Sequence, residues 1–175
     1  MSSDETVVRE LDDIGMVQIR GDLSDASFRK AVAAVIALDV PEMGKMIQDG
    51  NTGLAWMSTD ELLGFTPDPA AMTDALQTAL SDHHHLVLDV SDQRVIFELQ
   101  GPGWRDIVAK GMPVDFHVAA FGPGDFRRTR LGQVAAAVWC IDPMTARATV
   151  GRSVGGFAAE WLRVAALPSQ AEQVF

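Results

Sequence analysis

The segment from Gly151 to Gly155 reads GRSVG and matches the G-x-S-x-G spacing of a hydrolase nucleophile elbow. It lies between a predicted strand and a predicted helix, where such an elbow holds its serine. A hydrolase of this kind also needs an acid and then a histidine after the serine, but all four histidines precede Ser153. The chain order therefore argues against a catalytic triad, and we expect Ser153 to cap the following helix.

His83, His84 and His85 invite a metal-binding interpretation. Adjacent side chains on an extended segment point in opposite directions, so at most His83 and His85 could share a metal. No carboxylate-rich motif with metal-ligand spacing lies near them in the sequence. We therefore expect a solvated loop that leads into a strand, and we predict no metal ligand.

The single cysteine, Cys140, excludes an internal disulfide. It lies in the apolar run from Ala135 to Ile141, which is typical of an inert core thiol. The sequence also lacks the G-x-G-x-x-G and G-x-x-x-x-G-K-[ST] loops that hold dinucleotides and nucleoside phosphates. We accordingly predict no catalytic and no cofactor-binding residue in this chain.

Arg127, Arg128 and Arg130 form a basic cluster in an acidic chain. Alternation along a strand places Arg128 and Arg130 on one face. That face is either simply solvated or a contact with a partner protein, since arginine is enriched in interfaces. The candidate partner-interface residues are therefore these three arginines, Arg152 beside the last predicted helix, and whichever of the four tryptophans is exposed.

Composition narrows the classes of partner. With 24 Asp and Glu against 14 Lys and Arg, the net charge of −10 repels phosphate backbones and argues against nucleic-acid binding. No window approaches the roughly 18 uncharged apolar residues of a membrane span. The first residues also lack the basic and apolar regions of a secretory signal. We therefore expect a cytoplasmic protein without membrane association.

The elements that must position these residues are organised around the stretch from Leu86 to His117. An apolar strand over Leu86–Val90, a turn, and an alternating strand over Val95–Leu99 indicate a β-hairpin. A glycine-proline-glycine stop follows, and then an apolar stripe that begins at Trp104 predicts a helix ending at Gly111.

The remaining elements follow from periodicity and from turn residues. They are a strand over Met16–Gly21, a helix capped by Ser24 or Asp25, a loop over Met43–Asn51, strands over Leu54–Met57 and Leu62–Phe65, a helix from Asp68 and Pro69, one long strand over Arg128–Ile141 with a bulge at Gly132, a strand over Ala146–Val150, and a helix over Gly155–Leu167.

This order predicts an α+β fold with layered mixed or antiparallel sheets and helices. We expect residues 1–13 to be a flexible acidic tail and residues 169–175 a C-terminal tail. Residues 14–168 are expected to form either a single undivided domain or one made of two intimately packed halves at about 14–84 and 85–168.

Ordered pieces along nearly the whole chain resemble the gamma subunit family of heterotetrameric sarcosine oxidase. The pieces are Ile19–Asp22, Leu88–Arg94, Leu99–Pro102, Arg105–Gly111, Pro113–His117, Phe121, Thr129–Val134, Arg152–Ser153 and Trp161–Leu162. The family is similar in fold to the folate-binding domain of the glycine-cleavage aminomethyltransferase, in agreement with the layered α+β pattern.

The resemblance implies an accessory, non-catalytic subunit of a complex that oxidatively demethylates sarcosine to glycine. Its partners would be the alpha, beta and delta subunits, which carry FAD, FMN, NAD, tetrahydrofolate and zinc. Two alternatives stay open: a stand-alone folate-dependent one-carbon transferase on the same fold, and an interaction module of another amine dehydrogenase. The segment Arg130–Val134 differs from the asparagine and paired aspartates of the folate-binding relatives, which favours the accessory subunit.

Overall fold

The computed structural model describes residues 5–167 as two five-stranded sheets with four α-helices. Sheet A has the order β1 (Val7–Leu11), β7 (Arg94–Gln100), β10 (Thr145–Gly151), β9 (Val134–Asp142) and β8 (Phe126–Leu131). Sheet B has the order β3 (Met46–Asp49), β4 (Thr52–Ser58), β5 (Glu61–Thr66), β2 (Gly15–Gly21) and β6 (His85–Asp89). Neighbouring strands are antiparallel in both sheets. The helices are α1 (Ala26–Ile36), α2 (Pro69–Ala79), α3 (Trp104–Ala109) and α4 (Gly155–Ala165).

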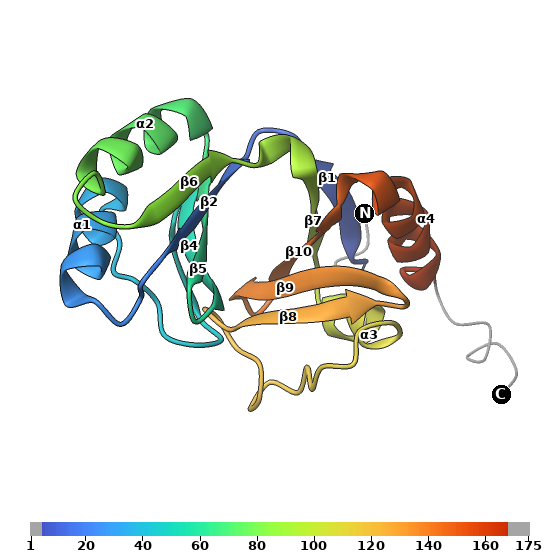
Figure 1. Ribbon diagram of the computed structural model, residues 1–175. Helices are drawn as coiled ribbons and strands as arrows, with labels where there is room; N and C mark the ends of the chain where they lie inside the picture. The colour runs from blue at the N-terminus through green and yellow to red at the C-terminus, as the bar shows by residue number, and fades with distance from the viewer. Residues whose placement is uncertain (1–4, 168–175) are drawn as a thin grey trace, which may run out of the picture.

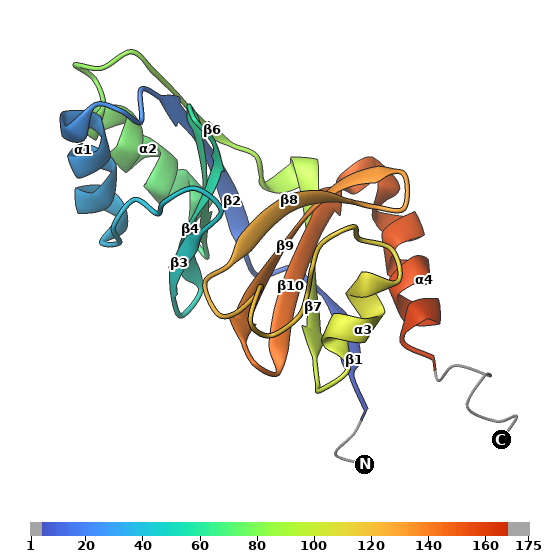
Figure 2. The same cartoon turned by 90° about the horizontal axis from the view of Figure 1, so that it is seen from below.

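These elements stack in layers, with α1 and α2 outside sheet B and α3 and α4 outside sheet A (Figures 1 and 2). Each strand therefore buries one face against helices and part of the other against the facing sheet. In β9, Val138 points to the helices, whereas Trp139 points between the sheets and lies 5.0 Å from the ring of Phe65. The predicted α+β fold is confirmed. None of the helices in residues 5–167 is long and apolar enough to cross a membrane.

Short-range signals place the first two helices correctly. Asp25 caps α1 by accepting a hydrogen bond from the Ser27 amide, and Asp68 caps α2 by accepting one from Ala71. The expected cap at Ser153 is wrong. Arg152–Val154 instead forms the 3-10 turn η2, and no side chain caps α4 at Val154.

The predicted hairpin over residues 86–100 is also wrong, although both strands exist. β6 pairs with β2 in sheet B, whereas β7 lies between β1 and β10 in sheet A. The 3-10 turn η1 (Ser91–Gln93) carries the chain from one sheet to the other, and Ser91 Oγ accepts the Met16 amide at 3.0 Å. Alternation identifies which face of a strand is buried but does not identify the strand's neighbour.

The predicted long strand over residues 128–141 is two strands, β8 and β9. They form a hairpin whose two-residue turn contains Gly132 with φ +58°. The glycine is thus the turn residue of a tight hairpin rather than a bulge, because only a residue without a Cβ takes this backbone angle at little cost.

Two segments expected to lack structure contain strands. Residues 7–11 of the predicted acidic tail form β1, and β3 lies within the predicted loop of residues 43–51. β1 is held to sheet A by main-chain pairing with β7, which composition does not reveal. The chain passes from sheet B to sheet A after Asp89 rather than at residue 84. β1 is an exception to this division, because it precedes the strands of sheet B in the sequence but belongs to sheet A. The predicted tail of residues 169–175 lies outside the described residues.

Candidate functional site

The predicted basic strand face lies on β8, at an edge of sheet A. Arg128 pairs with Ala137 and Arg130 with Ala135 across the β8–β9 ladder, so both arginines point to the side of sheet A that faces sheet B. Both side chains are exposed, as the alternation predicted. The neighbouring Arg127 points to the other side and is half-buried.

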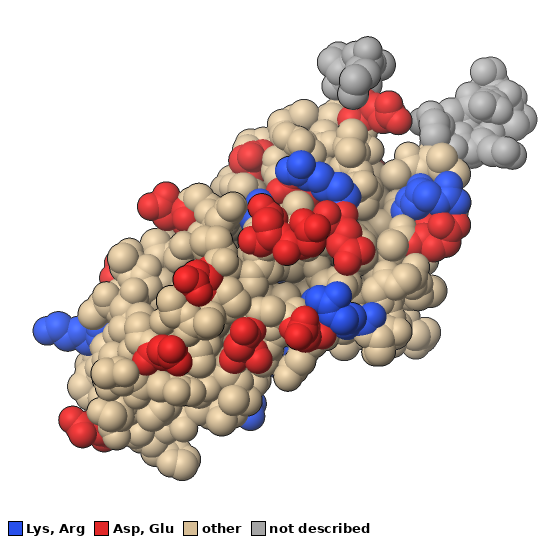
Figure 3. Space-filling model, turned by 90° about the horizontal axis from the view of Figure 1, so that it is seen from above, with Lys and Arg blue, Asp and Glu red and all other residues tan. Residues whose placement is uncertain are grey.

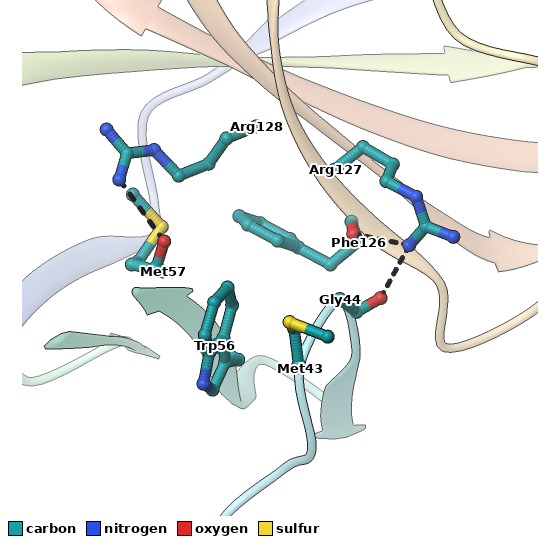
Figure 4. Close-up of a pocket in the computed structure, with 7 residues that line it drawn as sticks. All are labelled: Met43, Gly44, Trp56, Met57, Phe126, Arg127 and Arg128. Carbon is teal, nitrogen blue, oxygen red and sulfur yellow. Dashed lines mark hydrogen bonds between the residues drawn. The ribbon is translucent and has the colours of Figure 1, made fainter. Parts of the chain in front are cut away.

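Main-chain oxygens orient the side chains of Arg127 and Arg128 (Figure 4). Arg128 Nη1 donates to the Met57 carbonyl at 3.2 Å, and Arg127 Nη1 donates to the carbonyls of Gly44 and Phe126, both at 2.8 Å. Within residues 5–167, no carboxylate lies within ion-pair distance of Arg128 or Arg130. The charges of these two residues, which we call the β8 arginines, therefore remain available to an outside group.

Arg152 does not join this face. Its guanidinium donates to the carbonyls of Ser91 at 3.2 Å, Asp92 at 2.8 Å and Arg94 at 3.0 Å, and so clasps the η1 turn between the sheets. The structure therefore separates one of the four predicted interface residues from the other three.

Beside the β8 arginines lies an open cleft of about 520 Å³, which we call the seam cleft (Figure 4). Its lining residues come from both sheets and the connecting loop: Met43, Gly44, Trp56, Met57, Phe126, Arg127 and Arg128. The sequence pattern did not indicate this cleft. Its one sequence signal is Trp56, which is among the tryptophans considered as anchors and is only partly buried.

Main-chain hydrogen bonds between the two sheets fix the walls of the seam cleft. The Phe126 amide donates to Gly44 O at 2.9 Å, and the Met46 amide donates to Gly124 O at 2.9 Å. The Lys45 ammonium also contacts Asp125 Oδ1 at 2.8 Å. These contacts preform the cleft, because neither wall can move without breaking cross-sheet bonds.

Arg94 on β7 adds a further guanidinium to this region that the sequence did not indicate. Burial lowers the pKa of the Arg94 guanidinium below its usual value; the charge of Glu61 opposes this shift, and the charge of Arg128 adds to it. Glu61 in turn accepts hydrogen bonds from Gln18 at 2.8 Å and Arg20 at 3.2 Å. The acid whose charge acts on Arg94 is thus already bonded to two side chains of β2.

The other sequence candidates lie apart from the seam cleft. Ser153 is exposed in η2, and within residues 5–167 no hydrogen bond joins its hydroxyl to a histidine. Among the same residues, no three His, Cys, Asp or Glu side chains are grouped to hold a metal ion. Cys140 is buried, as expected, and burial raises the pKa of its thiol.

Charge is unevenly distributed over the surface. Acidic side chains gather along the face shown in Figure 3, in keeping with the excess of Asp and Glu in the chain. Against this background, exposed arginines without an acidic neighbour provide a local positive site.

The chain is similar in sequence to proteins of known name. The chain is 29% identical over 126 residues to sarcosine oxidase subunit gamma of Corynebacterium sp. (strain P-1), covering 72% of this chain and 61% of that protein. It is 31% identical over 111 residues to the subunit of the same name from strain U-96, covering 62% and 54%. The chain thus spans less than two thirds of the length of these relatives.

Solved structures also resemble this chain. The heterotetrameric sarcosine oxidase from Corynebacterium sp. U-96 contains a chain that superposes with a TM-score of 0.88 at 25% identity, covering 95% of this chain and 86% of that one. Aminomethyltransferase T of the glycine cleavage system from Bartonella henselae shares the fold, with a TM-score of 0.67 at 12% identity, over 91% of this chain and 45% of that one.

The family model described as "Sarcosine oxidase, gamma subunit family" matches residues 20–167. This range contains nearly all the structure described above, including the seam cleft and the β8 arginines. It also confirms the resemblance drawn from the ordered sequence pieces. The chain belongs to the sarcosine oxidase gamma subunit family.

Proposed function

We propose that this chain is the accessory gamma subunit of a heterotetrameric sarcosine oxidase, an enzyme that oxidatively demethylates sarcosine to glycine. The observation that carries the proposal is the superposition, with a TM-score of 0.88, on a chain of such a complex. In this assignment the chain contributes to assembly in the cytoplasm, and the alpha, beta and delta partners hold FAD, FMN, NAD, tetrahydrofolate and zinc.

The experiment that tests this assignment is co-purification. The affinity-tagged chain, isolated from its native source, is expected to bring down flavin-containing chains in fixed stoichiometry. A monodisperse monomer without partner chains would refute the proposal. Titration with tetrahydrofolate then separates the alternative class, because saturable micromolar binding to the isolated chain would favour a stand-alone one-carbon transferase.

Within this function, we assign the β8 arginines to the partner interface. Arginine in interfaces pairs with carboxylates through several N–H donors, and a positive site on an acidic protein can receive an acidic surface without opposing the field of the rest of the chain. The support is the exposure of Arg128 and Arg130 and their lack of a carboxylate neighbour in the described residues. Arg127 contributes at the rim, and Arg152 contributes by holding η1 in place.

Arg128→Glu combined with Arg130→Glu is therefore expected to weaken assembly while leaving the fold intact. Exposed strand charges contribute only about 0 to 1 kcal/mol each to stability, whereas opposing charges at an interface are costly. The measurement is complex yield at moderate salt, together with urea unfolding of the isolated variant. Arg29→Glu with Lys30→Glu on α1 makes the same charge change elsewhere and should leave the yield unchanged. Equal yields from both double variants would mean that the β8 face is merely solvated.

A further inference from the structure

We propose that the seam cleft is the receptor for one apolar side chain of a partner subunit, carried on a segment with an acidic residue beside it. This inference rests on the proposed function and specifies which contact holds the subunit in its complex. The occupant follows from two properties of the cleft, its apolar floor and its basic rim.

The floor is made of side chains that suit an apolar guest. Phe126 and Met57 form the base, and the partly buried Trp56 forms one side (Figure 4). Tryptophan lining a pocket is the residue type most often found at the energetic centre of interfaces. Thioethers adapt to the shape of a guest because the methionine side chain has several rotatable bonds.

Met43 stands at the mouth of the cleft with 75% of its surface exposed, the most exposed large apolar side chain in the described residues. An apolar side chain at this exposure gains free energy when a partner covers it. Its loop is tied to β8 through the hydrogen bond from the Phe126 amide to Gly44 O. The site is therefore preformed, and little ordering would be required on binding.

The rim determines the charge of the guest. Arg127 and Arg128 each use a single nitrogen for main-chain oxygens, so most of their N–H donors stay free. The nearest acid to Arg127, Asp125, lies 3.9 Å away and already binds Lys45. A carboxylate next to the apolar guest would meet the free N–H donors of Arg128, which is charge complementarity of the kind that sets partner choice.

The test uses the assembled complex with a photo-crosslinking residue in place of Met43. Crosslinking is expected to join this position to one peptide of a larger subunit, and that peptide should contain Asp or Glu near the attachment point. A peptide without an acid, a crosslink to a second copy of this chain, or no crosslink in an intact complex would each overturn the inference. Failure of the wild-type chain to assemble at all would instead contradict the proposed function.

Matched variants give a second readout. Met43→Glu is expected to weaken assembly by about tenfold or more, because it places a negative charge where the acidic segment binds. Met144→Glu makes the same change at an exposed methionine that does not line the cleft and should have no effect. Met43→Leu should assemble normally. If Met43→Glu and Met144→Glu behave alike, the cleft is not the receptor.

Charge reversal tests the rim directly. Arg128→Glu should weaken assembly, and changing the acid of the crosslinked peptide to Arg should restore it. Restoration requires that the two side chains meet in the complex, which a purely structural role of Arg128 would not produce. Absence of any rescue in a folded double variant would remove the carboxylate from the proposal.

Discussion

The two edges of sheet A carry arginines on the same face and use them differently. Near the β1 edge, Arg9 on β1 and Arg147 on the central strand β10 converge on Glu98 of β7, with Nε to Oε distances of 3.0 and 2.9 Å. At the β8 edge, Arg128 and Arg130 have no carboxylate within ion-pair distance in residues 5–167. The first group is a closed unit that joins three strands. The second is open, in keeping with the partner contact proposed for it.

The closed unit depends on a buried acid. Glu98 is only 4% exposed. Burial alone would raise the pKa of its carboxyl, but hydrogen bonds from Arg9 and Arg147, and their charges, outweigh burial and leave the pKa below its usual 4.5. The ionised form is thus stabilised in the folded chain, and it gives Arg9 and Arg147 an acidic partner that Arg128 and Arg130 lack within residues 5–167.

Glu98→Gln should therefore have the largest effect on stability. It removes the charge that compensates Arg147, whose side chain is mostly buried, and we expect a loss of about 3 kcal/mol. The value lies at the low end for a broken buried pair because Arg9 reaches solvent. Urea unfolding measures it. Glu98→Leu with Arg147→Met replaces both partners by apolar groups and should recover much of the loss; a neutral single variant would contradict the closed unit.

The pH dependence of the unfolding free energy should show a second, smaller effect of the Glu98 carboxyl. Because the folded pKa of Glu98 is depressed, its contribution is fully present above the unfolded pKa near 4.5 and disappears as the pH falls through the lower folded pKa. Unfolding free energies of the wild type and Glu98→Gln should therefore converge in that acidic window. The double variant Arg128→Glu with Arg130→Glu, measured in parallel, should lose as much unfolding free energy in this window as the wild type does. Parallel curves for wild type and Glu98→Gln would show that this carboxyl is not the source.

At the β8 edge, main-chain conformation should contribute more to stability than charge does, and the contribution should be modest. Gly132→Ala forces a Cβ onto the left-handed turn residue of the β8–β9 hairpin, and we expect a loss of about 1 kcal/mol. Gly156→Ala offers the control, because that glycine lies in α4 with open space around it and alanine favours a helix. Thermal unfolding should move in opposite directions for the two variants. A stabilised Gly132→Ala would contradict the turn geometry.

Local features of this fold could be predicted from the sequence, whereas pairings between distant residues could not. Asp25, Asp68 and Pro69 mark their helices because the capping group lies within three residues of its partner. The strand ladders join residues with no sequence signature of one another, so the hairpin at residues 86–100 and the long strand at residues 128–141 were wrong. β1 was missed for the same reason.

The candidate site shows the same division. Alternation correctly placed Arg128 and Arg130 on one exposed face, because strand periodicity is a local property. The seam cleft could not be predicted, since its walls come from residues 43–57 and 126–128 and meet only through cross-sheet hydrogen bonds. Arg152 has the same residue type as the β8 arginines, but its guanidinium is hydrogen-bonded to the η1 turn.

The crossing of β1 into sheet A sets an order of events during synthesis. Arg9 and its partner Glu98 are 89 positions apart, so β1 leaves the ribosome long before β7 exists. Sheet B, by contrast, has all its strands once Asp89 has emerged. We therefore expect the nascent chain to pass through a stage in which sheet B is assembled while Val7–Leu11 waits unpaired and the face of Met16 and Phe65 lacks its cover. Chains interrupted at that stage would be the ones most prone to aggregate.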